Sequence, residues 1–571
     1  MADDPNGNKK ELSMEMRLLL AFGLMGVVLF ATQYLMPKPP VKPATPPVEQ
    51  AQQSAKPPAA TPAPVTPKPA AAKAAAKAPG KKAAEAAPVA AVAAQAEETR
   101  IIDTNVYRIV FTNKGASIRS WVLKNYKDIN GKQIELVDDR AGRAFSYYYY
   151  TPPTGANLND ALFTVKQATP LSIEFEFSDG VTTAHKAFQF ETGSYRANFS
   201  SELSAGGKPV EHRLAWRGGF GDRTFHNALD VQHSVLYLAA KSKLITTTAK
   251  DASKGPIPAE GEFHFAGMED TYFAGVLLPE PGAALSFHTI HDKFALAQGE
   301  EEKEHVGVAF GGSGLIRSPL FVGPKDTDVL RATDRKLETM IDWGWFEIMA
   351  KPLFLALHWV NDKITHSWGW AIILATVVIN ILLLPLRFSQ IKSSQKMAAI
   401  QPEMQAIQGK YKDLSARDPK KQKQNEELME LYKKHGINPM GGCVPLLLQM
   451  PFFIAFFKVL SVAIELRGAN WMWVQDLSQP ETIPIRLLPV GMLVTQVLMQ
   501  KMTPVASPDP SQQKLMMIMM PVMMTVMFYG ASSGLVLYWL TGNVVGIVQQ
   551  YFFNKYGSKP TLAQASISKK K

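Results

Sequence analysis

The chain has 571 residues, of which 46% are hydrophobic, and it carries a formal net charge of +11. Apolar residues form long blocks with Lys and Arg gathered beside them, which favours a membrane protein over a nucleic-acid-binding protein. Because the chain has one cysteine, Cys443, an intramolecular disulfide is excluded, and any exported domain must be stabilised by its own core.

The first apolar block, residues 18–36, is long enough to cross a bilayer. Lys9, Lys10 and Arg17 precede it, and this positive charge predicts that residues 1–17 lie in the cytoplasm. A cleavable signal peptide is the alternative, but no cleavage site with small residues follows the block. We therefore predict an uncleaved N-terminal membrane anchor.

Residues 37–96 consist almost entirely of Pro, Ala, Lys, Val and Thr. This composition cannot bury a core and is typical of an extended, semi-rigid chain. We interpret the segment as a linker without a binding role.

Residues 97–336 show a hydrophobic period of two, which indicates β-strands. Apolar residues alternate with polar ones in two stretches, at Leu171, Ile173, Phe175 and Phe177 and again at Tyr195, Ala197 and Phe199. Asn-Gly at 130–131 and Asp-Gly at 179–180 are typical of turns between strands. The pattern predicts a soluble β-sandwich domain on the far side of the membrane.

This domain also contains residue types that occur in metal and phosphate sites. Four of its histidines are His212, His226, His233 and His264, and residues 216–222 are rich in glycine. The spacing of the histidines matches no metal motif, and the glycines match no phosphate-binding loop. We interpret the histidines as scattered surface residues and the glycine-rich segment as a turn.

Residues 343–366 return to a helical period, with an apolar stripe on one face. Five tryptophans lie in or beside this segment, namely Trp343, Trp345, Trp359, Trp368 and Trp370. Because tryptophan is enriched at bilayer surfaces, we predict an amphipathic helix that lies on the outer leaflet.

Residues 369–386 form a nearly unbroken apolar run that ends at Pro385, beside Arg387, as expected of a membrane span. Thr376 and Asn380 interrupt the run. They are four residues apart, so they share one face of a helix, and a polar face in lipid needs a partner, water or a substrate. We expect the function at this face.

Residues 387–442 contain eleven Lys or Arg, whereas the later loop 465–486 contains two. This contrast predicts that residues 387–442 lie in the cytoplasm. Apolar residues recur there at helical spacing on both sides of a turn at 415–419, which predicts a hairpin of two antiparallel helices. Interspersed glutamates make RNA binding the less favoured interpretation.

Four further apolar runs predict spans at 443–464, 485–502, 515–529 and 535–553, followed by a basic tail at 554–571. The chain then crosses the membrane six times, with both termini in the cytoplasm. Polar residues recur in these spans, at Gln449, Thr495, Gln496, Gln500, Thr525, Thr541 and Asn543. They are explained either by hydrogen bonds between helices or by a shared hydrophilic groove, and both readings remain open.

Several long motifs in this half resemble the YidC/Oxa/Alb family of membrane protein insertases. They are GINPMGGCVPLLLQMPFFIAFF at 436–457, ELR at 465–467, QKM at 500–502, DPSQQK at 509–514 and SGLVLYW at 533–539. The resemblance covers about 345–553, and the anchor, linker and outer domain are similar to the Gram-negative form of the family.

The resemblance implies a multi-pass helical protein of the bacterial inner membrane, with a five-helix insertase core and a large periplasmic β-sandwich. It implies no catalytic residue, cofactor or metal. The family's groove corresponds to Thr376, Asn380, Tyr538 and Trp539, Gln449 lies in the LLQMP motif, and we add Gln496 and Gln500 as candidate groove residues. The implied partners are nascent membrane proteins, the lipid bilayer, the Sec translocon, and the ribosome through the hairpin and the basic tail, without any other specific nucleic acid.

The chain departs from the family at one position. Family members usually carry an arginine five residues before the proline that ends the span, whereas Asn380 stands there and the nearest arginine is Arg387. A neutral amide costs less to bury in lipid than a charge, but it cannot attract an acidic segment. Our hypothesis is that this groove acts through hydration and hydrogen bonding.

Two other classes of protein remain as alternatives. An intramembrane hydrolase is suggested by the G-x-S-x-G pattern at 530–534, but no histidine follows His435 to act as the base. A secondary transporter would need broken spans in matching halves and an intramembrane acidic residue, and the sequence has neither.

Overall fold

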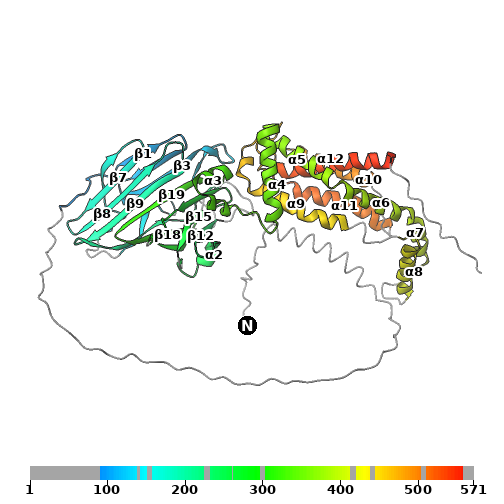
Figure 1. Cartoon of the computed structure of the whole chain (residues 1–571), viewed down its shortest axis with the longest axis horizontal. Coiled ribbons are helices and arrows are strands. Elements are labelled where there is room, and N and C mark those ends of the chain that lie inside the picture. Colours follow the sequence, from blue (N-terminus) through cyan, green and yellow to red (C-terminus); the bar gives the residue numbers. More distant parts are fainter. Residues whose placement is uncertain are drawn as a thin grey trace, which may run out of the picture.

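The computed structural model describes residues 90–137, 140, 142–150, 157–223, 232–259, 262–283, 285–295, 302–411, 420–436, 444–502 and 510–556. The predicted anchor at 18–36, residues 1–17, most of the linker and nearly all of the basic tail lie outside these residues. The described chain forms a β-rich domain followed by a helical part (Figure 1).

Three antiparallel sheets build the β-rich domain. The first has the order β1-β2-β3-β4, with β1 (Thr99–Asp103), β2 (Tyr107–Thr112), β3 (Ser117–Lys127) and β4 (Gln133–Glu135). The third has the order β14-β17-β18-β11-β5, with β14 (Ile257–Pro258), β17 (Ser286–Phe294), β18 (Lys303–Ser313), β11 (Glu211–Trp216) and β5 (Ser146–Tyr150).

The second sheet is the largest and has the order β13-β12-β15-β16-β19-β9-β8-β7-β6, with β10 paired to β9. Its strands are β6 (Thr164–Ala168), β7 (Ser172–Ser178), β8 (Thr182–Phe190), β9 (Arg196–Ala205), β10 (Lys208–Pro209), β12 (His233–Leu238), β13 (Lys243–Thr248), β15 (Phe263–Glu269), β16 (Phe273–Leu277) and β19 (Leu315–Pro324). The alternation at 171–177 predicted β7, where Ile173, Phe175 and Phe177 are buried. The predicted turn at 179–180 joins β7 to β8.

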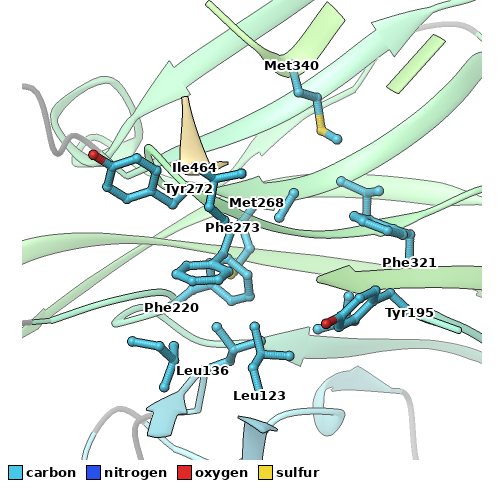
Figure 2. Packing of buried hydrophobic residues seen from close by; sticks show 14 of the residues in the cluster. Leu123, Leu136, Tyr195, Phe220, Met268, Tyr272, Phe273, Phe321, Met340 and Ile464 are labelled. Carbon is cyan, nitrogen blue, oxygen red and sulfur yellow. The ribbon is translucent and has the colours of Figure 1, made fainter. Parts of the chain in front are cut away.

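Large aromatic side chains fill the core of this domain. Trp121 and Trp216 stack with ring centroids 5.6 Å apart, and Tyr107 meets Trp121 edge-on at 5.4 Å. Such contacts add to the free energy gained by burying the rings. The same apolar cluster continues into the helical part, since Ile464 packs with β-domain residues such as Tyr272 and Phe273 (Figure 2).

The interpretation of the histidines was wrong for His212, which is fully buried. Its Nε2 lies 2.9 Å from Ser201 Oγ, and Nδ1 lies 3.3 Å from the carbonyl of Val210. Burial away from water therefore holds the pKa of His212 down at about 4. Among the described residues, no group of three or more His, Cys, Asp or Glu is arranged to hold a metal ion.

Helical segments connect the two parts of the chain. They are α3 (Thr327–Thr333), a 3₁₀ segment η1 (Arg335–Met340), α4 (Glu347–Val360) and a π-helical turn η2 (Asn361–Thr365), whereas α2 (Ala249–Ala252) packs within the β-rich domain against β13, β17 and β18. After η2 the chain bends by 117° into α5 (Trp368–Leu382). In Figure 1, α4 therefore lies across the ends of the other helices, next to the β-rich domain.

The remaining helices are α6 (Leu384–Ala399), α7 (Gln401–Lys410), α8 (Lys420–Lys434), α9 (Val444–Val462), α10 (Leu487–Met502), α11 (Pro510–Phe528) and α12 (Ser533–Tyr556). The C-terminal helix α12 packs against both α5 and α10. Tested by length and apolarity, no single described helix qualifies as a membrane span, although the bent pair of α4 with η2 and α5 does. The count of six spans stays a prediction.

The hairpin of α7 and α8 projects from the end of the helical part that is distant from the β-rich domain (Figure 1). Its helices are held together by buried Ile400, Met404, Leu428 and Leu431. Tyr411 donates a hydrogen bond to Glu427 across the pair at 2.8 Å.

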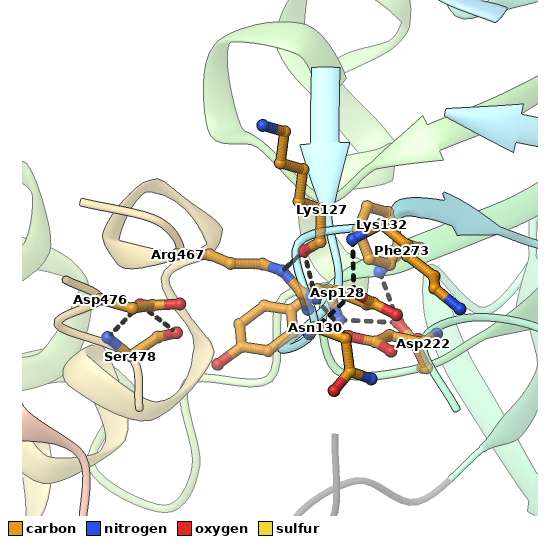
Figure 3. A network of polar contacts seen from close by, with 11 residues as sticks. Lys127, Asp128, Asn130, Lys132, Asp222, Phe273, Arg467, Asp476 and Ser478 are labelled. Atoms are coloured by element: carbon orange, nitrogen blue, oxygen red, sulfur yellow. Dashed lines mark hydrogen bonds and ion pairs between the residues drawn. The ribbon is translucent and has the colours of Figure 1, made fainter. Parts of the chain in front are cut away.

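Arg467, in the loop after α9, joins the helical part to the β-rich domain (Figure 3). Its guanidinium pairs with Asp222 and donates to the carbonyl of Lys127 at 2.8 Å, and the Arg467 and Asp222 side chains are 5% and 2% exposed. Asp222 ends the glycine-rich segment at 216–222, where Gly221 has a φ of +92° and lies so close to Asp270 that a side chain would collide with it. The segment that we interpreted as a turn thus supplies Asp222, the carboxylate that pairs with Arg467.

Glu465 lies in the same connection, in the 3₁₀ turn η4 (Ile464–Leu466). Burial, with Asp326 nearby, raises the pKa of Glu465 to about 7. Since the folded-state pKa exceeds the unfolded value, the stabilisation from the neutral acid is complete below about pH 4.5 and is lost as the pH rises through about 7.

We therefore expect Glu465→Gln to abolish this pH dependence. At pH 8 the variant should be more stable than the parent by about 2 kcal/mol. This free energy is smaller than the whole pKa shift would give, because Glu465 is partly exposed and solvent screens its charge. At pH 4.5 the two should unfold alike. Thermal unfolding at both pH values measures the difference, and an equal gain at both would show that ionisation of Glu465 is not the cause.

Candidate functional site

Thr376 and Asn380 lie on α5, and the structure gives both of them partners within that helix. The Thr376 hydroxyl, which is fully buried, donates to the carbonyl of Ile372 at 2.6 Å. The Asn380 amide donates to the carbonyl of Thr376 at 2.8 Å. The pair therefore satisfies its donors locally and can sit in an apolar helix at low cost.

Three helices, α5, α10 and α12, bring further polar side chains to this region. Gln549 of α12 donates from Nε2 to the carbonyl of Asn380 at 3.3 Å. Asn543 of α12 donates to Thr495 Oγ1 of α10 at 3.3 Å. We call the residues Thr376, Asn380, Thr495, Gln496, Gln500, Asn543 and Gln549 the polar cluster.

Three carboxamide oxygens in the polar cluster lack a hydrogen-bond partner among the described residues. They are the Oε1 atoms of Gln496, Gln500 and Gln549, and each of these atoms is buried. A buried acceptor without a donor costs about 1 to 3 kcal/mol. Three such acceptors on the neighbouring helices α10 and α12 favour a site that receives donors from outside the protein, such as water or a peptide backbone.

Arg387 adds a positive charge beside the polar cluster. It lies on α6, and its Nη2 is 3.4 Å from Met499 Sδ on α10. Gly546 on α12 makes room for it, because a Cβ there would stand 2.5 Å from that Nη2. No ion pair joins Arg387 to any acidic residue in the described ranges, so the arginine that the sequence suggested at the cytoplasmic edge turns toward α10 and α12.

Tyr538 and Trp539 lie in an aromatic group with α9 and α11 instead. The Tyr538 ring stacks on Phe456 with centroids 4.4 Å apart, and Trp539 meets Phe453 and Phe528 at 5.0 and 5.1 Å. Gln449 is within α9, but its side chain lies outside those that the structure describes. The structure thus links Asn380 of α5 to Gln549 and Thr495 of α10 to Asn543, both on α12, and it places Gln496 and Gln500 on α10 within five residues of Thr495. Tyr538 and Trp539 have different neighbours.

Sequence reasoning missed Gln549 as a site residue. It lies in the last two turns of the predicted span at 535–553, where a glutamine is readily taken for a residue at the membrane surface. Spacing gave no signal, because Gln549 follows Asn543 by six residues, which places the two side chains about 120° apart around a helix.

Two family models match the chain. The model described as 60Kd inner membrane protein matches residues 359–560, and the one described as YidC periplasmic domain matches residues 100–356. The boundary between them falls inside α4, the helix that lies between the β-rich domain and the other helices.

Curated relatives match over nearly the full length. The chain is 33% identical to a membrane protein insertase YidC of Geobacter metallireducens, over 95% of this chain and 98% of the relative. It is 32% identical to the YidC of Geotalea daltonii, over 95% of this chain and 99% of that relative. A crystal structure of YidC from Thermotoga maritima is 14% identical in sequence and has a TM-score of 0.30. The match covers 80% of this chain and 98% of the chain in that crystal structure. By its similarity to the curated relatives, the chain belongs to the family of YidC membrane protein insertases.

Proposed function

We propose that the chain moves nascent transmembrane segments from the cytoplasm into the bilayer of the bacterial inner membrane, alone or with the Sec translocon, through a groove lined by the polar cluster. The relatives are named as insertases, a function without a chemical reaction. The groove would lower the free energy of bringing polar groups of the incoming segment into the membrane.

The unpartnered oxygens of Gln496, Gln500 and Gln549 carry this proposal. An incoming segment exposes backbone N–H groups and a polar flank before it folds in lipid, and these groups need acceptors. Glutamine oxygens that the protein itself leaves unsatisfied can accept them, or can hold the water that does. Arg387, without an acidic partner in the described residues, would favour acidic flanks near the cytoplasmic entrance.

The α7–α8 hairpin and the basic tail would receive the client on the cytoplasmic side and face the ribosome. Six of the hairpin residues at 420–436 are lysine or histidine, and three are glutamate. A mixed but net positive surface suits an encounter with RNA-rich or acidic partners. The large domain would lie in the periplasm and both termini in the cytoplasm.

We expect the double variant Gln496→Leu/Gln500→Leu to lose insertion activity without losing stability. The substitution removes two acceptors that the parent protein leaves unsatisfied, so the helical part should unfold at the same temperature or higher. Insertion of a translated single-span substrate, measured by protease protection in liposomes, should fall about tenfold, which corresponds to about 1.4 kcal/mol.

Gln550→Leu is the matched control. Gln550 is a buried glutamine like Gln496, but it lies on α12 and its amide donates to Asn554 of the same helix at 2.9 Å. This variant should insert substrate as the parent does. Full activity in the double variant, with protein-dependent protection in the parent, would refute the groove while leaving the insertase function intact.

A further inference from the structure

A small cavity separates α3, at the end of the β-rich domain, from α4. Its volume is about 160 Å³. The lining residues are Thr327, Asp328 and Arg331 of α3, and Phe354, Leu355, His358, Trp359, Asp362 and Lys363 of α4 and η2. Since a water molecule occupies about 30 Å³ of the liquid, the cavity has room for about five groups of that size.

One polar side chain that lines the cavity has no partner. Thr327 is 4% exposed, and its buried hydroxyl makes no hydrogen bond with the residues that the structure describes. An unsatisfied buried hydroxyl is costly, and it can both donate and accept. It is therefore suited to a ligand that supplies a polar group in this cavity.

Carboxylates line one part of the cavity. His358 lies between them, with Nδ1 2.9 Å from Asp362 and Nε2 3.8 Å from Asp328. The Asp328 and Asp362 side chains remain 70% and 44% exposed, so their outer oxygens are accessible. Two accessible carboxylates that line one cavity favour an ammonium group that donates several hydrogen bonds.

Cations line the same cavity. Arg331 is oriented by Glu338, which accepts from its Nε at 2.6 Å. Lys363 has no ion pair within the described part of the chain, and it follows Asp362 directly. Positive and negative groups within one cavity match a zwitterion, in which a phosphate and an ammonium are joined by a short spacer.

The outer edge of the cavity is apolar and exposed. Leu355 and Trp359 line it, and with Trp345 and Ile348 they form an exposed apolar stripe along α4. If α4 lies on the outer leaflet, as its composition predicts, this stripe faces acyl chains while the charged cavity faces the headgroups. A ligand with acyl chains would contact both surfaces at once.

We propose that this cavity binds the headgroup of a zwitterionic phospholipid with a primary ammonium, of the phosphatidylethanolamine class, from the outer leaflet. The ammonium contacts Asp328 and Asp362, the phosphate contacts Lys363 and Arg331, and Thr327 hydrogen-bonds within the cavity. The lipid would anchor the β-rich domain and α4 to the membrane surface together. This inference rests on the membrane placement in the proposed function but not on the polar cluster.

Retention of lipid by the full-length protein in detergent tests the proposal. Equal amounts of a phosphatidylethanolamine and a phosphatidylcholine with the same acyl chains are added, and native mass spectrometry counts the lipid that stays bound. The ammonium of phosphatidylcholine is fully methylated and therefore has no N–H donor. We expect the protein to retain about ten times more phosphatidylethanolamine than phosphatidylcholine, equivalent to about 1.4 kcal/mol.

Asp328→Asn/Asp362→Asn should reduce this preference to near one, and Thr327→Val should weaken retention of phosphatidylethanolamine. Glu347→Gln, an exposed carboxylate of α4 outside the cavity, is the matched control and should keep the preference. Equal retention of both lipids by the parent, or an unchanged preference in the double variant, would overturn the proposal. Displacement by free phosphoethanolamine at the same concentration as the lipid would show a soluble ligand and would also overturn it. Insertion activity is not the readout, so failure of the polar cluster would leave this result unaffected.

Discussion

Arg467→Ala should separate the β-rich domain from the helical part. Removing the guanidinium leaves Asp222 buried without the charge that compensates it, and it removes two hydrogen bonds to the carbonyl of Lys127. Breaking a buried ion pair by deleting one partner costs about 3 to 5 kcal/mol. We expect faster hydrogen exchange in the connection around 463–469 and a lower unfolding temperature of the full chain.

Arg100→Ala provides the comparison. Arg100 also pairs with a carboxylate, Glu98 at 2.9 Å, but the two side chains are 50% and 38% exposed. An exposed pair contributes about 0 to 1 kcal/mol, so this variant should behave as the parent. If Arg467→Ala changed neither hydrogen exchange nor unfolding more than Arg100→Ala does, the connection between the two parts would depend on the apolar contacts of Ile464 instead.

Lys186→Ala should destabilise the β-rich domain itself. The Lys186 side chain is fully buried, and its ammonium donates to the carbonyls of Gly115, Ala116 and Phe145 at 2.9, 3.2 and 2.7 Å. It also lies 4.0 Å from the centre of the Tyr147 ring. The substitution leaves three carbonyls without this donor and creates a cavity, which together should cost about 3 to 5 kcal/mol.

Denaturant unfolding of the full chain, followed by hydrogen exchange in β5 and β8, measures this loss. Lys166→Ala is the control, because Lys166 is 59% exposed and pairs with Glu176 at the surface. A loss below about 1 kcal/mol at Lys186 would mean that water replaces the ammonium and satisfies the carbonyls.

The parts of the fold that depend on local pattern were predictable. The alternation at 171–177 is β7, because a strand with one buried face repeats every two residues. Helical spacing at 397–411 and 428–432 likewise matches the cluster that holds the hairpin together. Neither inference required knowledge of a distant partner.

Contacts between distant segments were not predictable from one sequence. Asp222 and Arg467 are 245 positions apart, and nothing near either residue identifies the other. Lys186 lies on the same buried face of β8 as Ala184 and Phe188, but the sequence does not show that carbonyls from two other segments surround its ammonium. Burial of a lysine depends on those carbonyls, and a periodicity does not reveal them.

For the candidate site, the sequence nominates residues but does not group them. Helical periodicity shows which side chains share a face, as with Thr376 and Asn380, but not which helix stands opposite. Tyr538 and Asn543 are five residues apart on α12, so they point to different neighbours, one to Phe456 and the other to Thr495.

The absence of a side chain at Gly546 ties that position to Arg387. The guanidinium occupies the space that a Cβ would need, so no other residue fits at 546 unless Arg387 moves. The two positions should consequently change together during evolution. In homologues with a larger residue at the position of Gly546, we expect the side chain at the position of Arg387 to be smaller or to point elsewhere.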